Sequence, residues 1–180
     1  MKSLKWMLRP IFMTWMSTLL LSSPIFAQVI YAHGQPGITP NWSSAKKVNV
    51  GTTFNWGKDR LKSLVWFTAA SGVLTETYFP TIDSAQIKDS QILVSDGKSF
   101  LVEERTQTYH SVEVNSPSLT TLVNLDNQGR FAIKHTFFTM QNSSTLVDEV
   151  EIHAYEDGLD YYLLVNPAIN NTGFGDYAHQ

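Results

Sequence analysis

Residues 63–83, "SLVWFTAASGVLTETYFPTID", predict a β-hairpin. The run from Val65 to Ala69 is apolar or small on both faces, which is typical of a strand that is covered on both sides. Gly72 can supply the backbone angles that a chain reversal needs. Pro80 ends the second strand because proline cannot donate to a β-ladder. The stretch therefore predicts two paired strands, the first of them lying inside a sheet.

The same period of two continues along the chain in both directions. Residues 130–139 and 146–154 each place their apolar side chains on one face, as expected of strands with one wet side. About ten candidate strands arise in this way, too many for a single open sheet, so the fold class is all-β with two antiparallel sheets packed as a sandwich. Residues typical of hairpin turns separate the strands at four places: Asp96-Gly97, residues 126–129, residues 141–144 and residues 156–158.

The first 27 residues have the three parts of an export signal. Lys2, Lys5 and Arg9 precede an apolar run over residues 11–21, and Ala27 provides the small residue of a cleavage site. A membrane anchor is the rival interpretation, but proline, serine and threonine interrupt the run before it reaches the ~20 apolar residues of a span. We expect a signal peptide over residues 1–27 and a periplasmic or extracellular protein.

Composition limits the class of the mature chain, residues 28–180. Its 153 residues suffice for one domain with a core. It holds ten Lys and Arg against sixteen Asp and Glu, a net charge of −6, which argues against a nucleic-acid partner. The absence of cysteine excludes disulfides and thiolate metal sites. Packing must therefore stabilise the domain.

Three segments in order carry a resemblance to a known family. They are "PGITPNWSSAKKVNVGT" (36–52), "VWFTAASGVLTETYFPTID" (65–83) and "QILVSDGKSFLVEE" (91–104). Together they resemble the N-terminal domain of bacterial glucoamylases and glucodextranases of glycoside hydrolase family 15. The resemblance runs from about Gln35 to the C-terminus and also includes Asn166-Pro167 and residues 173–177.

The resemblance implies a large antiparallel β-sandwich of the super-β-sandwich type, incomplete within these 180 residues. In that family the sandwich precedes a catalytic (α/α)6 barrel, which supplies the glutamates that hydrolyse α-glucans. The long helical periods of a barrel do not occur before Gln180. The implied partner is therefore the barrel of a longer enzyme, with an α-glucan or oligosaccharide bound through it, and no cofactor is implied.

Candidate residues for binding or for contact with that barrel gather in and before the opening hairpin. They are Trp42, Trp66, Phe67, Glu76, Tyr78, Phe79 and Asp83. These residues can also be explained without a sugar site. The hairpin pattern is complete without a ligand, and acidic residues that flank a strand usually face solvent. For Trp66 we favour packing in the core.

No residue is assigned a catalytic role. Glu149 and Glu151 share one strand face at a distance of ~7 Å, a separation that inverting glycosidases use. Nothing nearby suggests the apolar pocket that would raise the pKa of one of them. The five histidines are scattered without the spacing of a zinc site, so no metal is predicted; His135 is expected to be a hydrogen-bonded core residue.

Two functions of different classes remain. The chain is either the non-catalytic N-terminal domain of an exported glucoamylase-type hydrolase, or a free-standing β-sandwich module that binds carbohydrate or protein. In the second case Trp42, Trp56, Trp66 or Tyr78 would serve as stacking platforms. The downstream reading frame discriminates between them, because a barrel encoded there supports the first function and a stop codon the second.

Export generates the first testable prediction. Expressed in a secreting bacterium, the mature protein is expected to begin at Gln28, or at His33 if cleavage follows Ala32. Intact-mass analysis of the exported protein checks this. A soluble exported product that retains Met1 to Ala27 would contradict it.

Overall fold

The computed structural model describes residues 38–39, 47, 49–55, 60–61 and 63–172. Within them lie twelve strands, one short α-helix and one 3-10 turn. The elements are β1 (Asn49–Gly51), β2 (Phe54–Asn55), β3 (Arg60–Leu61), β4 (Trp66–Ala70), β5 (Val73–Tyr78), β6 (Ala85–Ser95), β7 (Leu101–Glu103), α1 (Glu104–Gln107), β8 (Thr108–Ser116), β9 (Leu119–Asp126), β10 (Phe131–Thr139), β11 (Leu146–Ala154), β12 (Asp160–Pro167) and η1 (Ile169–Asn171).

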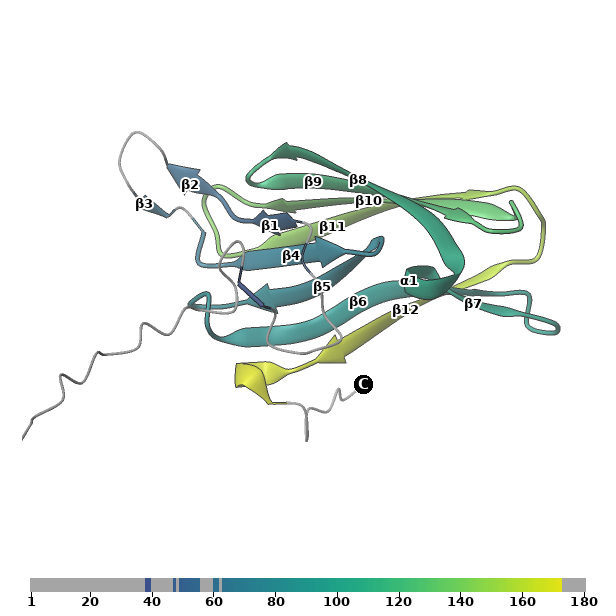
Figure 1. Cartoon of the computed structure of the whole chain (residues 1–180), viewed down its shortest axis with the longest axis horizontal. Coiled ribbons are helices and arrows are strands. Elements are labelled where there is room, and N and C mark those ends of the chain that lie inside the picture. The colour runs from purple at the N-terminus through teal and green to yellow at the C-terminus, as the bar shows by residue number, and fades with distance from the viewer. Residues whose placement is uncertain (1–37, 40–46, 48, 56–59, 62, 173–180) are drawn as a thin grey trace, which may run out of the picture. The chain divides into compact units, whose positions relative to one another are not determined.

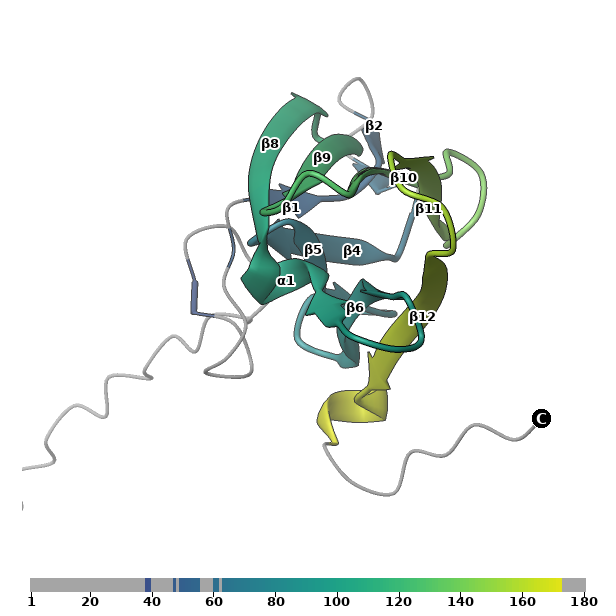
Figure 2. The same cartoon turned by 90° about the vertical axis from the view of Figure 1, so that its right-hand side faces the viewer.

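The strands form two large antiparallel sheets. One has the order β1-β4-β5-β6-β12, with β7 also paired to β6, and the other has the order β11-β10-β9-β8; β2 and β3 form a small ribbon (Figure 1). The two large sheets lie face to face in the end-on view (Figure 2). The all-β sandwich expected from the period of two is confirmed, and three of the four expected hairpin turns join strands that pair with each other: β6 with β7, β9 with β10, and β10 with β11. The hairpin prediction for residues 156–158 is wrong, because this turn leads from β11 in one sheet to β12 in the other.

The opening hairpin is the pair β4–β5, with β4 between β1 and β5 as expected for an inner strand. Gly72 has a φ of +75°, and a Cβ atom there would lie 2.1 Å from Asn124 Oδ1. Asn124 Nδ2, on β9 of the opposite sheet, donates a hydrogen bond of 2.7 Å to the Gly72 carbonyl oxygen. The turn therefore needs glycine both for its backbone angle and for the close approach of the second sheet.

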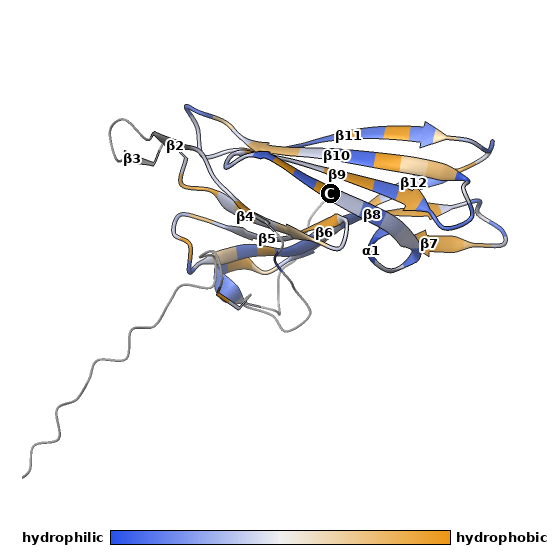
Figure 3. Cartoon of the chain, turned by 45° about the horizontal axis from the view of Figure 1, so that its top comes forward, coloured by the Kyte–Doolittle hydropathy of each residue, from blue (hydrophilic) through white to orange (hydrophobic). Residues whose placement is uncertain are grey.

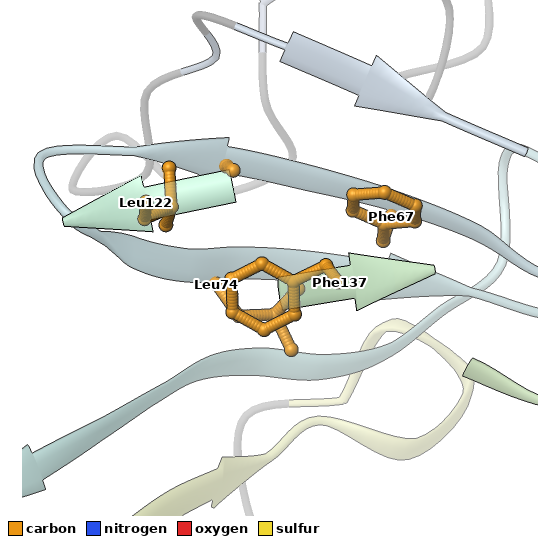
Figure 4. Packing of buried hydrophobic residues seen from close by; sticks show 5 residues of the cluster. Phe67, Leu74, Leu122 and Phe137 are labelled. Carbon is orange, nitrogen blue, oxygen red and sulfur yellow. The ribbon is translucent and has the colours of Figure 1, made fainter. Parts of the chain in front are cut away.

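Apolar side chains from both sheets form the core. Phe67 on β4 and Leu74 on β5 pack against Leu122 on β9 and Phe137 on β10 (Figure 4). The Phe67 and Phe137 ring centroids are 6.1 Å apart. A second cluster lies nearer β7 and contains Ile92, Val94, Val102, Phe131 and Ile133. Apolar and polar residues alternate along β9, β10 and β11 (Figure 3), so each strand gives one face to this core.

Hydrogen bonds join the sheets on the side of β1. The Thr52 backbone N–H donates to the Pro117 carbonyl oxygen at 2.7 Å, and Thr53 Oγ1 donates to the Thr139 carbonyl oxygen at 2.9 Å. Pro117 lies in the β8–β9 turn and Thr139 ends β10, so both bonds reach from one sheet to the other. This side of the sandwich is closed by the chain itself.

The core predicts a contrast between two leucines of β9. Leu122→Ala should lower the free energy of unfolding by about 2–5 kcal/mol, because it removes buried methyl groups and leaves a cavity. Leu125→Ala is the matched control: this side chain is 48% exposed, so the change should stay within about 0.5 kcal/mol. Urea denaturation of both variants checks the contrast. Equal losses would contradict the assignment of the β9 inner face.

Candidate domain interface

An apolar groove of about 650 Å³ opens between the two sheets, on the side of β11 and β12. Figure 2 shows both strands at this side, where each is the last strand of its sheet. Residues of both sheets line the groove, mostly through aliphatic side chains: Val65, Leu74, Ile87, Ile92, Leu146, Val150, Ile152, Leu163 and Val165. The groove is continuous with the core rather than a hollow on the outer surface.

Four side chains that point into this groove are exposed. Val150 and Ile152 on β11 are 36% and 38% exposed, and Leu163 and Val165 on β12 are 65% and 41% exposed. They occupy inner-face positions, where a sandwich normally buries its side chains. Exposed apolar surface that continues a core is typical of a contact site for another chain segment or domain. The geometry therefore supports an interface here.

A buried charged cluster lies beside the groove. His135 on β10 donates from Nε2 to Glu104 Oε1 at 2.8 Å, and its Nδ1 lies 3.0 and 3.1 Å from the two oxygens of Asp148. The ring also stacks on Phe137 at a centroid distance of 5.4 Å. Asp148, on the inner face of β11, is the member of this cluster that lines the groove.

The neighbouring carboxylates set the charge of His135. Burial alone lowers its pKa, but hydrogen bonds with Asp148 and Glu104, together with the charges of both, outweigh burial and raise the pKa to about 9. The imidazole is therefore a cation at neutral pH and donates from both nitrogens. It prevents Asp148 from presenting an unpaired charge to the apolar groove.

Glu104 links the cluster to both sheets. Its side chain is buried, and Oε2 accepts the Ile92 backbone N–H of β6 at 2.7 Å. Oε1 accepts from His135 and from Asn124 Nδ2, which belong to the opposite sheet. Glu104 is the first residue of α1, the short helix through which the chain passes from β7 to β8. One carboxylate therefore bonds to both layers of the sandwich.

The hairpin residues proposed from sequence are mostly enclosed. Phe67, Glu76 and Tyr78 are fully buried, and Trp66, which pairs with Tyr78 across the hairpin, is partly buried. The Tyr78 hydroxyl donates to the Glu76 carboxylate. Lys47 lies near this carboxylate: burial, the larger effect, lowers the Lys47 pKa, and the Glu76 charge opposes it.

The remaining proposed residues lie apart from that group. Phe79 is 42% exposed and lines one end of the groove. Asp83 is exposed in the turn before β6 and accepts a hydrogen bond from Thr81. Trp42 and Trp56 lie outside the described residues. Of the proposed set, the described groove thus includes only Tyr78 and Phe79.

The acid pair of β11 faces solvent. Glu149 and Glu151 are both exposed on the outer face, and Glu151 Oε1 accepts a hydrogen bond of 2.6 Å from Lys134 Nζ. This bond lowers the pKa of Glu151. A general acid needs the opposite shift, since it must hold a proton near neutral pH. The arrangement is that of a surface ion pair.

The part of the chain that the structure describes contains no candidate metal site. No group of three or more His, Cys, Asp or Glu residues there is arranged to hold an ion. His110 and His153 are exposed on different strands, and His33 and His179 fall outside the described residues. Nor does any helix among the described residues have the length and apolarity to cross a membrane.

Comparison with known proteins places this fold in a family. A family model described as "Glucodextranase, domain N" matches residues 32–180. The chain belongs to the glucodextranase domain N family. The resemblance drawn from the three sequence segments is thereby confirmed.

Two glucoamylases are similar to this glucodextranase N domain. A glucoamylase from Clostridium sp. (strain G0005) is 40% identical over 149 residues, which are 80% of this chain and 20% of the glucoamylase. The crystal structure of a bacterial glucoamylase complexed with acarbose matches with a TM-score of 0.66 and 36% identity, covering 73% of this chain and 20% of the other. The N domain therefore spans about a fifth of the length of the relatives that it matches.

Sequence reasoning missed the groove of the N domain. The sequence alternation identifies the inner face of β11, which contains Leu146, Val150, Ile152 and Ala154. This alternation predicts that these side chains are buried, not exposed. Nothing in the pattern tells which strands end a sheet, since this depends on pairings between distant segments. The apolar run of residues 161–165 is the signal that, combined with the sheet order, identifies the open side.

The His135 cluster predicts how the stability of the N domain depends on pH. The pKa of His135 is higher in the folded state than its value of 6.5 in the unfolded state, so protonation of His135 stabilises the folded state. This stabilisation is fully present below pH 6.5 and is lost as the pH rises through about 9. Urea denaturation should show a loss of roughly 2–3 kcal/mol between pH 6.5 and pH 10. His135→Gln should remove this slope, whereas the control His110→Gln, at an exposed position, should keep it. An equal slope in His135→Gln would contradict the assignment.

Proposed function

We propose that this chain is the non-catalytic N-terminal part of an exported glucoamylase-type glycoside hydrolase. The observation that carries the proposal is the match to a glucoamylase at 40% identity, in which this chain corresponds to only 20% of the length. The larger remainder of such an enzyme has room for a catalytic region. Hydrolysis of α-glucans is then the work of that region, and the sandwich supports it by packing.

The open side of the sandwich supports a packing role. Val150, Ile152, Leu163 and Val165 present apolar surface that water disfavours, and burial of such surface contributes about 25 cal/mol per Å². The outer-face acids and the enclosed Glu76–Tyr78 pair offer no open pocket for a sugar. Contact with the rest of an enzyme explains the described surface better than carbohydrate binding by a free-standing module does.

Export is part of the proposal and rests on sequence. The basic, apolar and small-residue parts of residues 1–27 support a signal peptide, and a chain without cysteine is compatible with an oxidising compartment. A substrate such as starch or its oligomers lies outside the cell, which makes export useful for this activity.

The downstream reading frame in the source DNA tests the proposal directly. A continuous frame that encodes an (α/α)6 barrel after residue 180 is the expected result. A stop codon directly after Gln180 would overturn it and favour the free-standing module.

The proposal also predicts the activity of the purified 180-residue chain. It should release no glucose from maltose or maltotetraose, because Glu149 and Glu151 lie on an exposed face without a pocket. A coupled glucose assay checks this, with Glu149→Gln and Glu151→Gln as matched variants. Glucose release that either substitution abolishes would place an active site on β11 and contradict a non-catalytic role.

A further inference from the structure

The dipeptide Asp-Gly occurs twice in the chain. Asp96-Gly97 lies in the turn between β6 and β7, and Asp157-Gly158 lies in the turn that leads from β11 to β12. Both glycines are exposed and have a positive φ, +69° at Gly97 and +74° at Gly158. The two turns therefore share a sequence and a glycine conformation, and they differ in how the aspartate is held.

An aspartate that precedes glycine can react with its own backbone. The glycine nitrogen attacks Cγ of the protonated carboxyl group, an N–Cγ bond forms, and a proton and the hydroxyl leave as water. Water then opens the five-membered succinimide ring. Opening at the main-chain carbonyl carbon gives isoaspartate, whose backbone runs through the former side chain, with no net change in composition. Glycine favours the attack because no Cβ shields its nitrogen.

Hydrogen bonds prevent this attack at Asp96. Oδ1 accepts the backbone N–H groups of residues 98–100 at 2.8 to 3.1 Å, and Oδ2 accepts the Ser99 hydroxyl at 2.6 Å. The nucleophile is also engaged, since the Gly97 N–H donates to Ser95 Oγ at 2.9 Å. Both carboxylate oxygens and the attacking nitrogen are thus held in place.

The same bonds keep Asp96 ionised. The hydroxyl and the backbone N–H of Ser99, followed by the N–H of Lys98, lower the pKa of Asp96 well below its usual range. Succinimide formation starts from the protonated carboxyl group, because hydroxyl leaves as water and an oxide ion does not leave. Asp96 is therefore protected by its geometry and by its charge.

Asp157 lacks these restraints. It is exposed, and among the described residues no hydrogen bond or salt bridge engages its carboxyl group and no hydrogen bond engages the Gly158 N–H. A Cβ atom at Gly158 would meet no other atom within 4 Å. The carboxyl group is thus free to turn toward the glycine nitrogen, and the space around the turn accommodates the ring.

We propose that Asp157 is a site of spontaneous isomerisation to isoaspartate, from which the hydrogen bonds of Asp96 protect the second Asp-Gly pair. The product carries one more methylene in the backbone of the turn that takes the chain from one sheet to the other. The reaction uses only water and the residues of this turn. The inference is therefore independent of the proposed function.

Peptide mapping of the aged protein tests the proposal. The 180-residue chain is kept for several weeks at about 37 °C and about pH 5, where part of an ordinary aspartate is protonated. Chymotrypsin then isolates each Asp-Gly pair in a short peptide, because leucine or aromatic residues flank both pairs. Chromatography separates the isoaspartyl peptides, and electron-transfer fragmentation identifies them. Isoaspartate should be about tenfold or more abundant at position 157 than at position 96, since release of a charge-assisted hydrogen bond is on this scale.

Unfolding is the control for the structural cause. In concentrated urea Asp96 loses its hydrogen bonds, so the two pairs should isomerise at similar rates. An unchanged peptide mass separates isomerisation from deamidation of asparagine, which alters the mass.

Two conservative variants locate the site. Asp157→Glu keeps the charge but would need a six-membered ring, so it should abolish the isoaspartate of this turn. Asp160→Glu is the matched control: this residue is also exposed in the same region but precedes tyrosine, and its substitution should leave isomerisation at Asp157 unchanged.

Three outcomes would overturn the inference. The first is as much isoaspartate at position 96 as at position 157 in the folded chain. The second is no isoaspartate at position 157 under conditions in which the urea-unfolded chain isomerises. The third is a preference for position 157 that persists undiminished in urea, since the hydrogen bonds of Asp96 would then not be its cause.

Discussion

The Glu104 carboxylate is the constraint on which the arrangement of the two sheets depends. It accepts hydrogen bonds from Ile92 in one sheet and from Asn124 and His135 in the other. A buried carboxylate without such partners would cost several kcal/mol, so the sheets can approach only where all three donors converge. His135 extends the network to Asp148 at the groove. Core packing and the position of β11 are thus coupled through one group.

That coupling explains why one side of the sandwich is closed and the other open. On the β1 side, Thr52 and Thr53 bond directly to the opposite sheet. On the β11 side, the polar contact ends at Asp148, and the groove beyond it is lined by aliphatic side chains of β11 and β12 such as Val150, Ile152, Leu163 and Val165. A domain with this asymmetry is suited to receive further polypeptide on one side. This agrees with a family whose relatives continue far beyond the matched region.

Local patterns made much of the fold predictable. Residues 63–83 predict the β4–β5 hairpin because strand alternation, Gly72 and Pro80 act within a few residues, and the same holds for β10 and β11. The role of Glu104 was not predictable, because its donors are 12 to 31 residues away and belong to different strands. The groove was missed for the same reason. Which inner faces stay exposed follows from strand order, and strand order is not a local property.

The central claim is that the two sheets are joined at Glu104 and that the sandwich is open at β11 and β12. Native-state amide hydrogen exchange of the 180-residue chain tests this claim most directly. The account predicts the slowest exchange at the Ile92 amide and in β4, β9 and β10, and fast exchange at those amides of β11 and β12 that face away from β10 and β6. Glu104→Gln should accelerate the Ile92 amide and its neighbours on both sheets together. Uniform protection across β11 and β12, or an Ile92 amide indifferent to Glu104→Gln, would contradict the account.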